Sequence, residues 1–381
     1  MTQHRVAQTD VLQGYLRYKE DFEATIRRVL ESGWYILGKE VESFEREFAS
    51  YCSVPHIVGV ANGTDAITLA LRALGVKKGD VVFTVSHTAV ATVAAVELAG
   101  AIPVLIDVDP ETYTIDLDKL SAAIKLWKAT RPTMRLHAVL AVHLYGHPCD
   151  VKGLRSICDE HSLFLIEDCA QAHGATVGDR PVGSFGHAAA FSFYPTKNLG
   201  AFGDGGAVAF AEDEPARKCR ALREYGWRTR YLSDVPGMNS RLDELQAAIL
   251  SIKLRYLDKE VHARRQLASK YDRAFADLLV TPSVRSGFQH AYHLYVVRTL
   301  HREHLRSFLA REGIGTGVHY PVPVHRQLAY AGRIESGPGG LEVTDRISQE
   351  ILSLPMHPFM SDADAEAVIS SVRAGLYAAR Q

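Results

Sequence analysis

The feature that most constrains the fold is a regular alternation of apolar runs and helical patterns between residues 56 and 211. Seven apolar runs have the length and composition of buried strands: 56–61, 81–86, 102–108, 137–145, 163–168, 188–194 and 206–211. Helical patterns separate most of these runs, notably at 65–74, 89–99, 117–128 and 151–160. Alternating strands and helices form a mostly parallel sheet covered on both faces. We therefore predict an α/β domain with a seven-stranded sheet sandwiched by helices.

The remaining segments predict N-terminal helices and a smaller second domain. Apolar residues recur at helical spacing in 20–32 and 39–51, ahead of the first strand. Towards the C-terminus the sequence predicts a long charged helix, two strands and a last helix, at 240–277, 291–298, 314–319 and 361–378. A chain of 381 residues exceeds one ordinary core. We expect a large domain over 1–253 and a small α+β domain over 254–381.

Composition excludes several classes of function. A formal net charge of −1 gives no electrostatic reason to bind nucleic acid or an anionic membrane. The N-terminus, MTQHRVAQTD, lacks the apolar core of a signal peptide. The longest apolar run, 89–106, contains Glu97 and is interrupted by Gly100 and Pro103, so it does not predict a membrane span. Five cysteines without a C-x-x-C pair favour a reduced, cytoplasmic protein.

Two of the predicted strands end beside residues that can carry chemistry. Asp168 ends the run LFLIED, and Lys197 lies between FSFYPT and the glycine-rich NLGAFGDGG. A desolvated lysine has a lowered pKa and can form a Schiff base with a carbonyl. Pyridoxal phosphate (PLP) requires such a lysine and an acid at its pyridine nitrogen. The alternatives are a solvated surface lysine and, for Asp168, the N-cap of a helix. As a pair, the two residues predict a catalytic site.

A phosphate site is predicted where the first strand meets the next helix. The segment VGVANGTDAITLALRAL reads as a strand, a glycine-containing turn and a helix. Backbone N–H groups of Gly63 and Thr64 would face an anion at the positive end of that helix. A tight connection needs the same residues, so this motif is weak by itself. The sequence contains no G-x-G-x-x-G and no G-x-x-x-x-G-K-[ST], which argues against a dinucleotide or P-loop site.

Five motifs together carry a resemblance to a known family. They are ANGTDA at 61, EDCAQAHGA at 167, FSFYPTKNLGAFGDGG at 191, NSRLDELQAA at 239 and VHYPVPVH at 318. Over nearly its whole length the chain resembles the DegT/DnrJ/EryC1/StrS family of nucleotide-sugar aminotransferases, which are PLP enzymes of fold type I. The resemblance implies that Lys197 binds the cofactor and moves the substrate proton, and that Asp168 holds the pyridinium. It also implies that Gln171 contacts the phenolic oxygen and that the phosphate is held by Ser192, Gly63 and Thr64.

The same resemblance implies residues from a second subunit and a position for the substrate. Asn239 would reach the phosphate of the partner's site, and Arg241 would lie near the substrate there. His319 and Tyr320 would lie near the sugar. The working unit would be a homodimer with two shared sites.

One position departs from the pattern of the family. Many members place an aromatic ring over the cofactor within the segment that reads SHTAVAT here, and the aligned residue is Ala89, which cannot stack. His87 could replace the ring, or it could be satisfied by a backbone partner. Members that act as dehydratases carry histidine in place of the lysine, so the presence of Lys197 favours transamination.

The family resemblance implies a nucleotide-linked keto sugar as acceptor and L-glutamate as donor. NSRLDELQA and GIGTGVHYPVP resemble the branch that aminates a C3 ketone, with a dTDP-linked 6-deoxy sugar favoured. The alternatives are a UDP-linked 3-keto uronate, a 4-keto sugar, and a PLP-binding regulatory protein without turnover. A metal-dependent hydrolase is a further alternative, because five residues could suggest a metal site: His143, His147, Cys149, Cys158 and His161. Their spacing matches no zinc signature, and we expect no metal.

Overall fold

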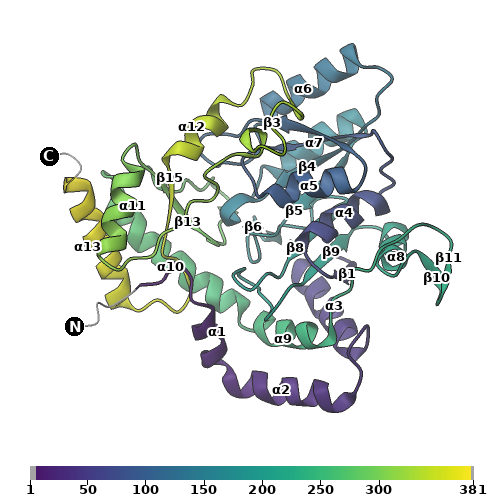
Figure 1. Cartoon of the computed structure of the whole chain (residues 1–381), viewed down its shortest axis with the longest axis horizontal. Helices are drawn as coiled ribbons and strands as arrows, with labels where there is room; N and C mark the ends of the chain where they lie inside the picture. Colours follow the sequence, from purple (N-terminus) through teal and green to yellow (C-terminus); the bar gives the residue numbers. More distant parts are fainter. Residues whose placement is uncertain (1–5, 379–381) are drawn as a thin grey trace.

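The core of the protein is a mixed eight-stranded sheet (Figure 1) in a computed structural model that describes residues 6–378. The strand order is β1-β9-β8-β5-β4-β2-β3-β14. The strands are β1 (His56–Val60), β2 (Val81–Val85), β3 (Ile102–Ile106), β4 (Leu136–Val142), β5 (Phe164–Asp168), β8 (Ala188–Ser192), β9 (Gly206–Phe210) and β14 (Glu335–Ser336). β9 pairs antiparallel with both β1 and β8, and the other pairs are parallel.

All seven predicted strands are present, because each apolar run is buried on both faces of the sheet. Along β4, Val139 and Ala141 join one hydrophobic core, whereas Ala138 and Leu140 join the core on the opposite face. The helices that cover the two faces or follow the strands are α3 (Lys39–Cys52), α4 (Gly63–Ala73), α5 (Val90–Leu98), α6 (Leu117–Thr130), α7 (Val151–His161) and α8 (Asp213–Leu222). The eighth strand, β14, was not predicted, because it is two polar residues long.

The predicted long helix over 240–277 is wrong in one respect. It is two helices, α9 (Glu244–Leu254) and α10 (Leu257–Phe275), separated at Arg255 and Tyr256. α9 is buried and contacts α3 and the N-terminal helix α2 (Lys19–Ser32). At the break, the Tyr256 ring stacks on Tyr18, between α1 (Val11–Arg17) and α2, with the ring centroids 3.9 Å apart.

The C-terminal part has a hydrophobic core of its own, built from α10 and the elements that follow it. These are β13 (Tyr295–Arg298), α11 (Arg302–Arg311), β15 (Ile351–Leu354) and α13 (Asp362–Ala378). The helix α12 (Glu342–Glu350) lies between them in the chain, but its buried Ile347 joins a core of the large sheet. The last helix is confirmed and the strand over 291–298 is shorter than predicted. The strand predicted over 314–319 is wrong, because Ile314 and Gly317 make isolated bridges with Val6 and Ser353 instead.

Short elements connect these layers. They are η1 (Leu144–Gly146), β6 (Thr176–Val177), β7 (Arg180–Pro181), β10 (Trp227–Thr229), β11 (Leu232–Ser233), β12 (Phe288–Gln289) and η2 (Val324–Arg326). Among the described residues, no helix has the length and apolar character needed to cross a bilayer.

Candidate active site

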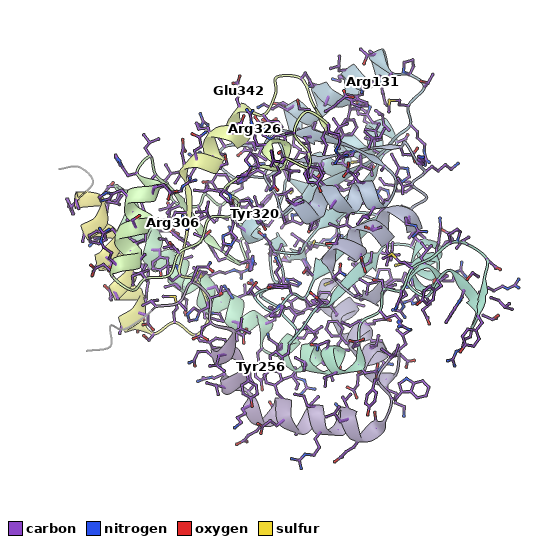
Figure 2. The ribbon with its side chains drawn as sticks, viewed as in Figure 1. Arg131, Tyr256, Arg306, Tyr320, Arg326 and Glu342 are labelled. Carbon is purple, nitrogen blue, oxygen red and sulfur yellow. The ribbon has the colours of Figure 1, made fainter. Side chains whose placement is uncertain are left out.

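A cavity of about 540 Å³ lies where β4, β5 and β8 end. Ligands of α/β proteins bind beyond the carboxyl ends of parallel strands. Six of the ten predicted site residues line it, together with Ala89: Gly63, Thr64, Asp168, Gln171, Ser192 and Lys197. The other four do not line it: Asn239, Arg241, His319 and Tyr320. Tyr320 is nevertheless central in the molecule, between the sheet and the C-terminal helices (Figure 2).

Asp168 is held in one orientation at the end of β5. Its Oδ2 accepts a hydrogen bond from the Thr92 hydroxyl at 3.0 Å, and its Oδ1 accepts one from the Ala170 N–H at 3.1 Å. Burial raises the pKa of the carboxyl, while these donors and the charge of Lys197 oppose the rise. The alternative of a helix N-cap is wrong, because the next residues form turns.

Lys197 lies in the turn after β8, and it is half-buried. Its backbone N–H donates to the Tyr194 carbonyl at 2.9 Å, which fixes the turn. Burial lowers the pKa of the amine to about 8, although the Asp168 carboxylate favours the charged form. The alternative that Lys197 is a solvated surface lysine is therefore wrong.

We call the N-terminus of α4 the cradle, because it has the geometry that the predicted phosphate site requires. Asn62 caps the helix, with its Oδ1 accepting from the Asp65 N–H at 2.8 Å. The first N–H groups of a helix have no partner inside it, so those of Gly63 and Thr64 are oriented to bind an anion. A Cβ on Gly63 would lie 2.7 Å from the Ser192 Cβ. Glycine is therefore required for Ser192 to approach the helix end.

Gln171 connects the cavity wall to His319 and Tyr320. Its Oε1 accepts from the Tyr145 N–H at 2.7 Å, and its Nε2 donates to the Tyr320 hydroxyl at 3.0 Å. The Tyr145 hydroxyl in turn donates to the His319 carbonyl. Burial, reinforced by the charge of Asp168, raises the pKa of Tyr320 to about 12. His319 is also held from the far side, where its Nδ1 pairs with the Ser353 hydroxyl at 2.8 Å.

His87 is fully buried and does not line the cavity. Its Nε2 pairs with the Tyr145 hydroxyl at 2.8 Å, and burial lowers its pKa to about 4. Since the Tyr145 hydroxyl donates to His319, the Nε2 of His87 is the donor in this pair. Of the two alternatives for His87, the structure favours a buried histidine held by a hydrogen bond, although the partner is a side chain rather than the backbone. Its Nδ1 has no partner among the described residues. Ala89 lines the cavity and gives that wall a methyl group instead of a ring.

Asn239 and Arg241 lie outside the cavity of their own chain. Asn239 is exposed and forms a bridge with Glu224, and Arg241 is half-buried. Between them, the buried Ser240 accepts from the Ala61 N–H at 3.1 Å and donates to Asp65 at 2.7 Å. The two hydrogen bonds of Ser240 hold the segment 239–241 beside the cradle, whereas Asn239 and Arg241 do not line the cavity.

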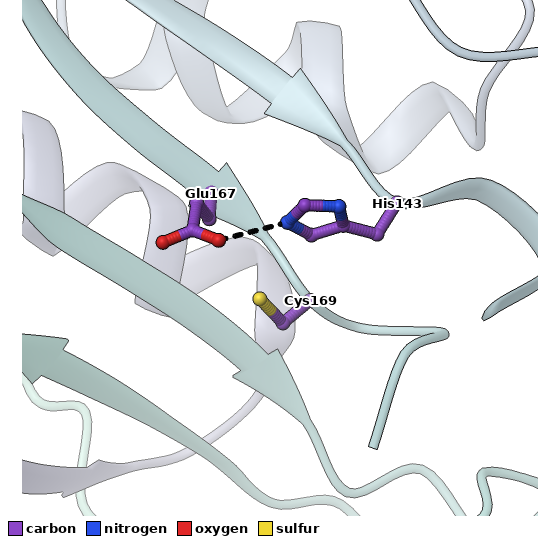
Figure 3. Close-up of side chains that lie close together, drawn as sticks. All are labelled: His143, Glu167 and Cys169. Carbon is purple, nitrogen blue, oxygen red and sulfur yellow. Dashed lines mark hydrogen bonds and ion pairs between the residues drawn. The ribbon is translucent and has the colours of Figure 1, made fainter. Parts of the chain in front are cut away.

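One group of potential metal ligands lies beneath the site: His143, Glu167 and Cys169 (Figure 3). His143 Nε2 pairs with Glu167 at 3.0 Å, and its Nδ1 accepts from the Cys149 N–H at 2.9 Å. The Glu167 carboxylate also accepts three backbone N–H groups from residues 183–186. Both ring nitrogens and the carboxylate are therefore engaged, and the group acts as a buried link between β4 and β5.

The half-buried Lys197 and the buried Asp168 line one cavity together with the N-terminus of α4. This combination is the one expected of PLP-dependent transferases with an α/β sheet. The chain belongs to the DegT/DnrJ/EryC1/StrS aminotransferase family, whose sequence profile matches residues 17–373. This confirms the predicted family, fold class and enzyme class. The cofactor is pyridoxal phosphate, as predicted.

Two characterised relatives and one crystal structure illustrate the similarity. The chain is 45% identical to dTDP-3-amino-3,4,6-trideoxy-alpha-D-glucose transaminase of Streptomyces venezuelae, over 97% of this chain and 96% of the relative. It is also 45% identical to dTDP-3-amino-3,6-dideoxy-alpha-D-galactopyranose transaminase of Aneurinibacillus thermoaerophilus, over 95% and 97%. The crystal structure of S. venezuelae DesV with a ketimine intermediate is 44% identical, covers 98% of both chains and has a TM-score of 0.92.

Proposed function

We propose that this aminotransferase moves an amino group from L-glutamate to the C3 ketone of a dTDP-linked 6-deoxyhexose, for amino-sugar biosynthesis. The observation that carries the transamination is that Lys197 and Asp168 line one cavity, in which the charge of Asp168 acts on the Lys197 amine. Both relatives described above are named as dTDP-3-amino sugar transaminases and match this chain over its length. They support dTDP and C3 over the UDP-linked and C4 alternatives.

Each residue of the cavity has a defined task in this reaction. When bound, pyridoxal phosphate withdraws electrons from the amino-bearing carbon, so that its proton can be removed. Asp168 keeps a negative charge at the pyridine nitrogen, and Thr92 holds that carboxylate in place. Lys197, with a pKa of about 8, can accept and return a proton near neutral pH.

The remaining residues hold the ends of the cofactor and the substrate. Gly63, Thr64 and Ser192 would hold the phosphate at the start of α4. Because Gln171 already accepts from Tyr145, its amide presents an N–H to the phenolic oxygen. His319 and Tyr320 flank the sugar, since Gln171 and Tyr145 tie both to the cavity wall.

The proposal includes a homodimer with shared sites, a cytoplasmic location and a two-domain chain divided at residue 253. Asn239 and Arg241 support the dimer, because they are displaced from their own cavity and would complete that of a partner. Exposed large apolar residues before α3 and in the β10–β11 hairpin supply surface for it: Trp34, Tyr35, Ile36, Tyr231 and Leu232. Five free cysteines are consistent with a reducing compartment.

A panel of nucleotide-linked 3-keto and 4-keto sugars tests the function, with the aminated position read by NMR. We expect amination at C3 of a dTDP-linked sugar with glutamate as donor, by ping-pong kinetics. The Lys197→Ala variant should retain PLP binding and lose transfer. A wild-type protein that converts PLP to pyridoxamine phosphate with glutamate, yet aminates no sugar of the panel, would contradict the proposal. A protein that binds PLP without any turnover would favour the regulatory alternative.

A further inference from the structure

A second, smaller cavity of about 40 Å³ lies on the other side of Lys197, and we call it the rear chamber. Lys197 lines both the rear chamber and the active-site cavity. The other walls come from the N-terminal segment, from α9 and α10, and from the turn before α13. The remaining lining residues are Thr9, Asp10, Val11, Gly14, Pro195, Thr196, Asn198, Lys253, Glu260, Arg264, His357, Pro358 and Phe359.

Three side chains that line the chamber each carry a buried polar atom without a hydrogen-bond partner within the described chain. The atoms are Asn198 Oδ1, Glu260 Oε1 and His357 Nδ1. Their side chains are 5%, 9% and 8% exposed. Leaving such an atom unpaired is destabilising, because it has lost its hydrogen bonds to water. A buried water typically makes about three hydrogen bonds and needs roughly 10–15 Å³ of such space, so the chamber fits ordered water.

The chamber also leads towards the surface. A third cavity, of about 460 Å³, is bordered by the exposed Leu16 and Arg17 of α1. Glu260, Pro358 and Phe359 line both this surface cavity and the rear chamber. Glu260 is the member of this shared wall that can carry a proton, and burial raises the pKa of its carboxyl. The rear chamber is therefore lined by Glu260, which also lines the surface cavity, and by Lys197, which also lines the active-site cavity.

We propose that the rear chamber holds ordered water and gives Lys197 a proton-exchange route to solvent, through Glu260, that bypasses the substrate cavity. The proposal rests on the proposed function, in which Lys197 carries the substrate proton. In the exchange, the Lys197 ammonium gives a proton to chamber water, and that water protonates the Glu260 carboxylate. The resulting carboxylic acid releases its proton to water of the surface cavity and becomes a carboxylate again. A solvent proton returns along the same route, so no net charge or electron is transferred.

Gly14→Ala tests the route without disturbing the reacting groups. A Cβ on Gly14 would lie 3.5 Å from Phe359 Cε2, an ordinary contact, so a methyl narrows the chamber without a clash. Replacing a helical glycine by alanine stabilises a helix by about 1 kcal/mol. A slower exchange in this variant therefore cannot come from a weakened fold. Leu12→Ala, on the same helix but 61% exposed, is the matched control.

The PLP-loaded enzyme is incubated with glutamate in D₂O, and two quantities are measured. They are the deuterium incorporated at the α-carbon of the recovered glutamate and the 2-oxoglutarate formed. The readout is the ratio of the first quantity to the second. In Gly14→Ala the ratio should fall about fivefold, the effect of one lost hydrogen bond on a rate, with 2-oxoglutarate formation unchanged. Glu260→Gln should lower the ratio similarly, and Leu12→Ala should not. An unchanged ratio in both chamber variants would overturn the route.

A crystal structure of the wild-type protein gives a readout that does not depend on activity. We expect water within hydrogen-bond distance of at least two of Asn198, Glu260 and His357. At least one such water should be lost in Gly14→Ala. A dry chamber would overturn the proposal even if transamination is confirmed. If the wild type forms no 2-oxoglutarate, the proposed function fails instead, and the crystal structures alone decide whether the chamber holds water.

Discussion

The reactivity of Lys197 results from a balance between burial and one charge. Burial lowers the pKa of the amine from 10.5 to about 8, and Asp168 partly restores it. An amine reacts only when deprotonated. In the cofactor-free protein, Lys197 should therefore react with an amine-specific reagent with a midpoint near pH 8, about two units below an ordinary lysine. Labelling across a pH series, followed by peptide mass spectrometry, measures that midpoint.

The Asp168→Asn variant tests in which direction the Asp168 charge shifts the pKa of Lys197. The carboxylate favours the ammonium form, so its removal should move the Lys197 midpoint to a lower pH. Thr92→Val should leave the charge in place and change the midpoint less, because it removes only a hydrogen bond to the carboxylate. A midpoint that rises in Asp168→Asn would show that another group sets the pKa.

Some residues of the site could be predicted from the sequence and others could not, for a physical reason. Lys197 and Asp168 follow apolar runs directly, so their positions at strand ends could be inferred. Thr92 and Tyr145 act through partners that are distant in sequence, Asp168 and His319, and nothing near them marks these contacts. Their roles depend on how β4, β5 and α5 are placed side by side, which only the folded chain provides.

At the scale of elements, the start of α4 is the most tightly constrained part of the site. Gly63→Ala would place a Cβ 2.7 Å from the Ser192 Cβ and force the helix end away from β8. Because the cradle depends on that approach, we expect PLP affinity to fall tenfold or more, about 1.4 kcal/mol. A spectroscopic titration of the cofactor-free protein measures it. Ser192→Ala removes one hydroxyl without moving the helix and should weaken binding less.

The link between η1 and the segment 317–320 is a second testable element. Tyr145→Phe removes the donor to the His319 carbonyl and the acceptor for the His87 Nε2. We expect a loss of about 1–3 kcal/mol in the free energy of unfolding, because buried polar groups become unpaired. The KM for the sugar should rise, whereas the half-reaction with glutamate should remain nearly intact. Tyr113→Phe, in a neighbouring ring that packs on Tyr145, is the control for both measurements.

Helices and strands could be predicted from the sequence where the burial of their side chains is uniform along the element. They could not be predicted where that burial changes within the segment. The strands of the large sheet are buried on both faces, so unbroken apolar runs marked them. The charged pattern continues through Arg255 and Tyr256, and it therefore hid the break between α9 and α10. Residues 314–319 have apolar character, but their backbone forms isolated bridges with Val6 and Ser353 instead of a strand, which the local pattern could not indicate.

At the scale of the whole molecule, the chain itself supplies the residues that line the active-site cavity described above. Asp168, Lys197 and the α4 cradle all come from the sheet and its helices. Ser240 fixes the segment 239–241 against Asp65, yet Asn239 and Arg241 stay outside this cavity. In the proposed homodimer, the same segment would reach the cavity of the partner subunit instead.

Subunit complementation tests that arrangement directly. Lys197→Ala and Asn239→Ala should each be inactive or strongly impaired as homodimers. In a mixed dimer with shared sites, Lys197 of one subunit meets Asn239 of the other, so one of the two sites is intact and the second carries both defects. Random exchange makes half of the dimers mixed, and activity should recover to about one quarter of wild type. If each chain completes its own site, no mixed dimer contains an intact site and mixing restores nothing. Mass spectrometry of the exchanged sample verifies that mixed dimers formed, so a failure to recover activity would count against shared sites.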